Sequence, residues 1–110
     1  MTIQEVAEKL GLTAVAGKEG MGRMVSGCYI GDLMSLAMAQ LEEGNLWITI
    51  QTNLNVVAVA SLKEAGAVIL ADGVVLDANA SAKAEEEGIP VLCSDASAYT
   101  LAKQLGVFGI

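Results

Sequence analysis

Residues 46–73, LWITIQTNLNVVAVASLKEAGAVILADG, decide the fold. The stretch begins with LWITI (46–50) and comes near its end to AVIL (67–70), two short apolar runs without polar alternation. Such runs are typical of strands that are buried on both faces of a parallel sheet. The segment between them, 54–66, is long enough for a helix and ends at Gly66, a residue type that favours a helix C-terminus. The stretch therefore predicts a strand–helix–strand unit with two parallel strands.

The same alternation extends from this unit toward both ends of the chain. On the C-terminal side we predict a helix over 78–88, a strand over 89–92, a helix over 96–106 and a last short strand over 107–110. On the N-terminal side we predict a helix over 2–11 with the capping-box residues Thr2 and Glu5, strands over 12–17 and 24–31, and a helix over 33–41 that Asp32 caps. Repeated βαβ units predict an α/β fold: a three-layer α/β/α single domain, residues 1–110, with a mostly parallel sheet.

The composition narrows the classes of function. The net charge is −7, which disfavours nucleic-acid binding, because that affinity comes from neutralised phosphates. No apolar run reaches the ~20 residues of a membrane span, and the N-terminus lacks a basic leader, so we expect a cytoplasmic protein that does not enter membranes. The chain has no histidine, and Cys28 and Cys93 lie far apart, so we predict no metal site, no cofactor and no Ser–His catalysis.

The glycine-rich segment GKEGMGRMVSG, residues 17–27, resembles a phosphate-binding loop at first sight. A Walker A loop requires GxxxxGK[ST], and no GK[ST] occurs in the chain. Gly20 and Gly22 supply two glycines of a GxGxxG pattern, but Val25 stands at the third. The segment also leads into a predicted strand, so no helix N-terminus directs its amides at an anion. We predict a flexible connector.

Polar residues follow the predicted parallel strands where each one ends, at the edge of the sheet where ligands bind in open α/β folds. They form a set of candidate ligand-binding residues, which are Asp32, Gln51, Thr52, Asn53, Asp72, Gly73, Ser94 and Asp95. Taken singly, Asn53 or Asn55, Asp77, and Ser94 or Asp95 are more simply interpreted as helix caps than as ligand contacts. We predict no catalytic residue.

Three segments resemble one known family: GCYIGDLMS (27–35), the stretch 46–73 and EEGIPVLCSDASAYTLAKQL (86–105). They are similar to the DRTGG domain family, in particular to its short stand-alone members in anaerobic bacteria and to the N-terminal domain of HPr kinase/phosphorylase. The resemblance implies a three-layer α/β/α domain that acts as a regulatory or dimerising module. In place of the family's name-giving Asp-Arg pair, this chain has Gln-Thr-Asn at 51–53, and it contains no P-loop kinase motif.

Three hypotheses about function follow. The resemblance and the lack of catalytic residues favour a non-catalytic regulatory or sensor domain that forms a homodimer, binds a partner protein and holds a small metabolite or nucleotide at the carboxyl ends of its strands. The alternative, by analogy with the stand-alone relatives, is an adaptor or accessory subunit of an anaerobic, hydrogenase-type redox complex. The third is a small enzyme, with Asp32, Asp72 or Asp95 as general acid or base and Lys18 or Arg23 holding an anion.

Overall fold

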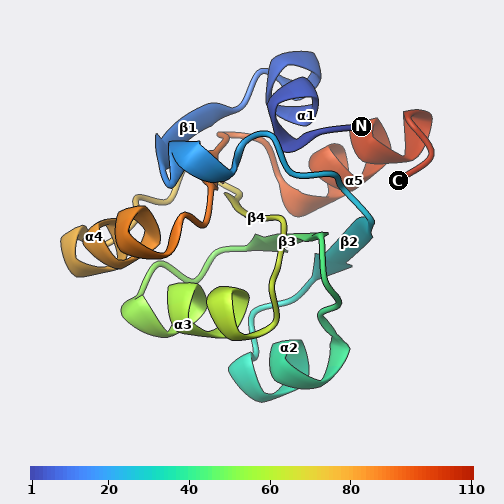
Figure 1. The fold of residues 1–110 in the computed structure, drawn as a ribbon. Helices are drawn as coiled ribbons and strands as arrows, with labels where there is room; N and C mark the ends of the chain where they lie inside the picture. The colour runs from blue at the N-terminus through green and yellow to red at the C-terminus, as the bar shows by residue number, and fades with distance from the viewer.

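A computed structural model describes all residues from Met1 to Ile110 (Figure 1). In chain order the elements are α1 (Ile3–Leu10), β1 (Thr13–Ala16), the 3-10 helix η1 (Lys18–Gly20), β2 (Gly27–Ile30), α2 (Met34–Gln40), β3 (Asn45–Thr49), α3 (Leu54–Leu62), β4 (Ala67–Leu70), α4 (Ala78–Glu87), β5 (Val91–Cys93) and α5 (Ala98–Val107). None of the helices combines the length and the apolar character that crossing a bilayer requires. The predicted α/β fold is confirmed.

The five strands form one sheet in the order β1-β5-β4-β3-β2. From β2 to β5 each strand pairs in parallel with the next, so that Trp47 lies opposite Val68 and Ile69 lies opposite Leu92. β1 pairs antiparallel with β5 and has a register shift between residues 14 and 16. The sheet is thus mostly parallel, as predicted, and β1 adds an antiparallel edge beside β5.

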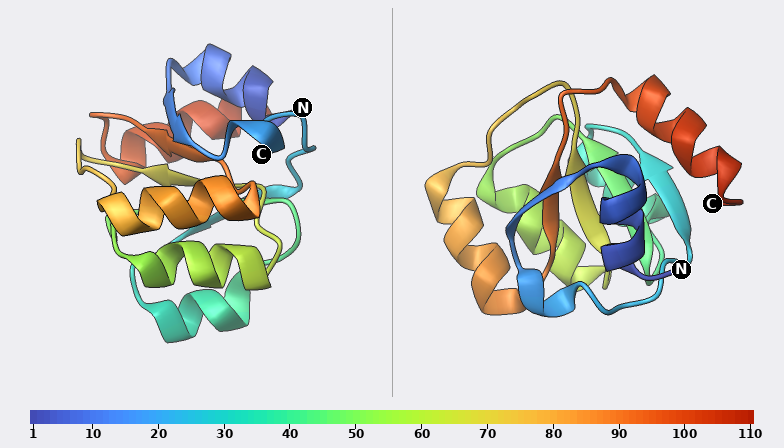
Figure 2. Two further views of the ribbon diagram at one scale, coloured as in Figure 1. Left: turned by 60° about the vertical axis from the view of Figure 1, so that its left-hand side comes forward. Right: turned by 90° about the horizontal axis from the view of Figure 1, so that it is seen from above.

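Helices cover both faces of the sheet (Figure 2). On one face α2, α3 and α4 lie side by side over a core that contains Trp47, Val56 and Val68. On the other face α1 and α5 cover a core that contains Ile48 and Leu101. Neighbouring residues of β3 belong to different cores, because alternate side chains of a strand point to opposite faces. Both faces are buried, and for this reason the central strands are unbroken apolar runs in the sequence.

The connections between strands create one switch point. The chain moves one strand position at a time from β2 to β5, and the helices α2, α3 and α4 all lie on the same face of the sheet. After β5 the chain crosses to the opposite face and enters α5. The loops after β4 and β5 therefore leave these neighbouring parallel strands on opposite sides. In open α/β sheets, ligands bind at such a switch point.

The predicted start of α1 is confirmed. Thr2 Oγ1 accepts a hydrogen bond from Glu5 N (3.1 Å), and Glu5 Oε1 accepts one from Thr2 N (3.0 Å). These two bonds satisfy backbone N–H groups that no helical carbonyl can reach. The helix ends at Gly11, whose φ of 67° is left-handed and is adopted by glycine without steric cost.

The strand predicted over 107–110 is wrong. α5 runs into this segment, and a turn follows in which Phe108 N and Ile110 N both donate to Leu105 O. A strand needs a free sheet edge, whereas this end of the chain lies in a helical layer. There Lys9 Nζ is 5.4 Å from the centroid of the Phe108 ring. The apolar residues therefore close a helix and do not extend the sheet.

The segment 17–27 connects β1 with β2, which lie at opposite edges of the sheet. Gly17 N donates a hydrogen bond to Glu85 Oε1 (2.7 Å). A β-carbon at Gly17 would overlap the backbone carbonyl of Ile89, and Gly20 is packed almost as closely against the end of α4. The glycines here permit close packing of backbone on backbone. The predicted flexibility of this connector stays a prediction.

Candidate functional site

The loops after β4 and β5 are joined by backbone hydrogen bonds. Asp72 N donates to Ala96 O (2.9 Å), and Gly73 N donates to Ser94 O (2.9 Å). Ser94 N in turn donates to Leu70 O (3.0 Å), which extends the ladder between the two strands. Each loop therefore holds the other in place at this edge of the sheet.

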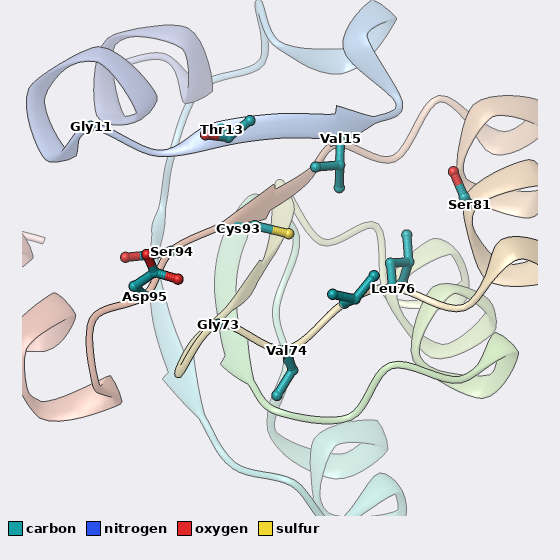
Figure 3. Close-up of a pocket in the computed structure, with 11 residues that line it drawn as sticks. Gly11, Thr13, Val15, Gly73, Val74, Leu76, Ser81, Cys93, Ser94 and Asp95 are labelled. Atoms are coloured by element: carbon teal, nitrogen blue, oxygen red, sulfur yellow. The ribbon is translucent and has the colours of Figure 1, made fainter.

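Asp72 and Gly73 have positive φ angles of 57° and 70°. Glycine tolerates the left-handed conformation, and aspartate is among the few other residues found in it regularly. Two such residues in succession turn the chain sharply as it leaves β4. The following residues, 74–76, then lead toward α4 and face β1 across the space beside β5 (Figure 3).

A pocket of about 460 Å³ lies between β1, β5 and residues 73–76 (Figure 3). α4 adds Ser81 to its lining, and the end of α1 adds Gly11. The pocket therefore lies at the β4–β5 switch point, where the fold itself creates a crevice. Its volume falls within the range of roughly 300–1,000 Å³ that is typical of small-molecule sites.

One end of the pocket is polar. Ser94 and Asp95 lie there beside Gly73, and Thr13 adds a hydroxyl from β1 (Figure 3). Ser94 Oγ accepts a hydrogen bond from Ala96 N (3.0 Å) and keeps its own proton for donation. The Asp95 carboxylate and the Thr13 hydroxyl make no hydrogen bond within the chain. These groups are free to bind a ligand.

The other end of the pocket is apolar. Val15 and Leu76 form its walls, and the sulfur of Cys93 points between them (Figure 3). Burial raises the pKa of the Cys93 thiol, because desolvation disfavours the thiolate. The thiol is therefore protonated at neutral pH and behaves as a small apolar group.

The structure brings together three of the eight candidate residues, Gly73, Ser94 and Asp95, in the lining of this pocket. Asp72 lies next to them in the chain but outside the lining. The remaining four, Asp32, Gln51, Thr52 and Asn53, form hydrogen bonds at the ends of β2 and β3. The polar edge of the sheet is thus divided into a pocket and a separate hydrogen-bond network.

Asp32 is the centre of that network. Its Oδ1 accepts hydrogen bonds from Thr49 Oγ1 (2.8 Å) and Ile50 N (3.0 Å), and Gln51 Nε2 donates to its backbone oxygen (3.1 Å). The predicted capping role of Asp32 is wrong, because Leu33 occupies the N-cap position of α2 and makes no side-chain cap. The carboxylate instead satisfies the Thr49 hydroxyl, which is buried at the end of β3.

The interpretation as helix caps holds for Asn53 and fails for Asp77. Asn53 Oδ1 accepts a hydrogen bond from Asn55 N (2.9 Å) and so caps α3. Asp77 occupies the N-cap position of α4 but makes no capping bond. Its carboxylate accepts a hydrogen bond from Thr52 Oγ1 (3.1 Å) instead. The link ties the loop after β3 to the start of α4.

Ser94 and Asp95 are not helix caps either. α5 begins only at Ala98, and Ser97 caps it by accepting a hydrogen bond from Thr100 N (3.2 Å). Ser94 and Asp95 stand too far before the helix to reach its first amides. Both residues therefore remain available to the pocket.

The sequence prediction missed the residues that β1 and α4 contribute, among them Thr13, Val15 and Ser81. No local pattern indicates that β1 pairs with β5 from the other end of the chain. Thr13 and Val15 are two residues apart and therefore share one face of a strand. This signal becomes informative only once the neighbours of that strand are known.

Two further hollows of about 430 Å³ each lie near the amino ends of the parallel strands, and Arg23 borders both. All the other charged residues in their linings are glutamates, and Met24 is the one apolar side chain in either. They therefore lack a wall that could hold the body of an organic ligand. No group of three or more His, Cys, Asp or Glu side chains is placed to hold a metal ion.

A small α/β domain with a ligand-sized pocket at its strand ends has the architecture of a binding module. Residues 5–107 match the family model of the DRTGG domain, and the chain belongs to the DRTGG domain family. The resemblance found in the sequence is thereby confirmed.

A solved structure has the same fold. It contains the CBS and DRTGG domains of the regulatory region of Clostridium perfringens pyrophosphatase, complexed with the activator diadenosine tetraphosphate. The TM-score is 0.73 at 13% sequence identity, and the match covers 94% of this chain and 45% of that chain. This chain thus spans less than half the length of the pyrophosphatase region, and the likeness shows the fold alone. No curated protein matches the sequence.

Proposed function

We propose that this chain is a non-catalytic regulatory domain that senses a small metabolite or nucleotide in the pocket at the β4–β5 switch point. It acts as a homodimer and passes the signal to a partner protein. The observation that carries the proposal is the pocket itself. Two strand-end loops and an antiparallel edge strand enclose a cavity of ligand size with free polar groups at one end.

The chemistry of the pocket favours binding over catalysis. Asp95 supplies its one carboxylate, so no second acid or base stands beside it. The Cys93 thiol has a raised pKa and is a poor nucleophile. The carboxylate of Asp32, a candidate acid in the sequence, is bonded to Thr49 outside the pocket. With no histidine in the chain to activate a hydroxyl or thiol, these features support a sensor.

The family supports a regulatory role. In the C. perfringens pyrophosphatase, the DRTGG domain belongs to the regulatory region, and that complex contains a nucleotide activator. By analogy, a ligand bound to this chain would alter the activity of a protein that the domain contacts.

The homodimer forms, in this proposal, along β2. This edge strand, Gly27–Ile30, has no charged residue, proline or bulge of the kind that protects an open edge, whereas β1 at the other edge has a register shift. Ile30 and Leu33 are 46% and 64% exposed beside it. Antiparallel pairing of two β2 strands across a twofold axis would cover these side chains and join the two sheets.

A ligand screen tests the sensor role. Thermal unfolding is measured for the wild type and for Val15→Trp with nucleosides, nucleotides, sugar phosphates, amino acids and nicotinamide cofactors. Val15 is exposed on an edge strand, so an indole there fills the pocket without disturbing the core. A ligand at a hundred times its dissociation constant adds about 2.7 kcal/mol to stability. In a domain of this size that raises Tm by about 10 °C or more.

A shift in the wild type that Val15→Trp abolishes supports the proposal. A shift that Val15→Trp leaves unchanged places the ligand elsewhere and contradicts it, as does the absence of any shift across the whole panel.

The adaptor hypothesis stays a prediction, and no contact in the structure favours it. Its test is the gene neighbourhood: iron–sulfur or hydrogenase genes beside this gene would support it, and their absence would remove its basis.

A further inference from the structure

The charges around the pocket restrict the class of ligand, if the sensor role proposed above holds. None of the six basic residues of the chain lines the pocket, whereas Asp95 places a carboxylate at its polar end. The other three aspartates, Asp32, Asp72 and Asp77, follow strands or precede helices at this same edge of the sheet. A phosphate brought to the pocket would therefore meet charge of its own sign.

Most backbone amides at the polar end are already bonded within the chain. Successive backbone N–H groups in a turn can form a concave nest that binds phosphate. Here, however, the N–H groups of Asp72 and Gly73 donate to the carbonyls of Ala96 and Ser94. Ala96 N is likewise bonded to Ser94 Oγ. The one amide left free at this end, Asp95 N, stands beside the Asp95 carboxylate, and no cation accompanies it. A phosphate would therefore find no set of converging donors here.

The groups that remain free suit a ligand that donates hydrogen bonds. The Asp95 carboxylate is an acceptor only, with two oxygens side by side. An acidic residue near a strand end plays the same part in dinucleotide-binding folds, where it accepts a hydrogen bond from a ribose hydroxyl. Thr13, on β1, adds a hydroxyl that can both donate and accept a hydrogen bond (Figure 3). Vicinal hydroxyls are therefore well matched to this end.

The apolar end suits a flat body. Val15 and Leu76 lie on opposite sides of the space into which the Cys93 sulfur points (Figure 3). Ser81, on α4, stands at the rim with a hydroxyl that makes no hydrogen bond within the chain and is able to bind a ring nitrogen. A heterocyclic base would bury its faces against the aliphatic walls and keep its polar edge near Ser81.

We infer that the pocket binds a nucleoside without phosphate, whose ribose diol donates to Asp95 and whose base lies between Val15 and Leu76.

Calorimetric titration with adenosine, AMP and ATP at low salt tests this inference in the wild type, Asp95→Asn and Asp72→Asn. In the wild type, adenosine should bind about tenfold more tightly than AMP, because the 5′-phosphate lies near Asp95, and added salt should narrow the difference. Asp95→Asn should weaken adenosine binding about tenfold or more, because it removes a hydrogen bond to a charged group. It should also bring the affinities for adenosine and AMP together, which a purely structural effect would not do.

Asp72→Asn is the matched control. This replacement removes one negative charge from the same end of the strands, and Asp72 lies outside the pocket lining. Asparagine also tolerates the left-handed conformation of this position. The affinity for adenosine should stay as in the wild type, and the affinity for AMP should rise by less than it does in Asp95→Asn.

Three outcomes overturn the inference. AMP or ATP binding as tightly as adenosine would refute a nucleoside held at Asp95. Adenosine binding that is unchanged in Asp95→Asn would refute it as well. Both results leave the sensor role intact. A complete lack of adenosine binding refutes it too. The sensor role is then decided by the panel screen, since a ligand of another class that Val15→Trp excludes would preserve it.

Discussion

Gly73 faces the Asp95 carboxylate so closely that a β-carbon at position 73 would stand 3.0 Å from Asp95 Oδ1. The two residues belong to different loops, which leave β4 and β5 on opposite faces of the sheet. The hydrogen bond from Gly73 N to Ser94 O holds the loops at this distance. Packing of one backbone against the other therefore sets the polar end of the pocket.

Replacing Gly73 with alanine should destabilise the fold. A left-handed φ costs an L-residue about 1–2 kcal/mol, and the new β-carbon would also crowd the Asp95 carboxylate. Urea unfolding measures the loss. Gly22→Ala serves as the control, because a β-carbon at Gly22 would have no atom within 4 Å and its φ is not left-handed. Equal stability of the two variants would contradict the account of this turn.

Removing the Asp32 carboxylate in Asp32→Ala should reduce the free energy of unfolding by about 1–3 kcal/mol. The Thr49 hydroxyl, 2% exposed, would lose its acceptor at the end of β3. In a Thr49→Val background the same replacement should cost less, because no buried hydroxyl is left unsatisfied. A double-mutant cycle in urea measures the coupling. If the losses of unfolding free energy in the two single variants simply add in the double variant, the hydrogen bond between Asp32 and Thr49 contributes nothing to stability.

The fold should lose stability at alkaline pH because of Cys28. Burial raises the pKa of its thiol from 9.0 to about 11, so between these values the folded chain keeps a proton that the unfolded chain has lost. The contribution to stability is complete below pH 9 and is lost as pH rises toward 11. Cys28→Ala should show a shallower decline in unfolding free energy over this window. Parallel declines in the two proteins would mean that the thiol titrates normally.

A lysine on the edge strand should separate the proposed dimer. Ile30→Lys places a charge on β2 that two antiparallel copies could not bury, a device by which natural sheets protect open edges. Sedimentation should then give a dimer for the wild type and a monomer for the variant. Leu62→Lys changes another exposed apolar residue, on α3 and away from β2, and should remain dimeric. A monomeric wild type, or a dimeric Ile30→Lys, would rule out this interface.

Much of the fold could be predicted because its central strands are buried on both faces. LWIT and AVIL are unbroken apolar runs for this reason, and the glycines after the helices separate one unit from the next. The edges were harder to predict. β1 pairs with a strand almost eighty residues later in the chain, and VFGI has a strand-like composition but continues α5 into a turn. No local sequence pattern indicates either of these two features.

The candidate site was predictable in part for a related reason. Gly73, Ser94 and Asp95 follow parallel strands, and position alone marks them as candidates. Gln51 and Asn53 occupy equivalent positions after β3 but lie outside the pocket. Whether a residue at a strand end lines the pocket depends on the face of the sheet to which the chain crosses after that strand. α5 buries Leu101 and Leu105 in the core that α1 also covers, and no residue near the strand ends reveals this.

The most direct test of the sensor role is an NMR titration of the labelled domain with the compound that gives the largest thermal shift in the panel. The account predicts saturable changes in the amide resonances of Thr13, Gly73, Ser94 and Asp95, with those of residues 51–53 unmoved. Changes centred on residues 51–53 and Asp32, with no change in the amide resonances of the loops after β4 and β5, would contradict it.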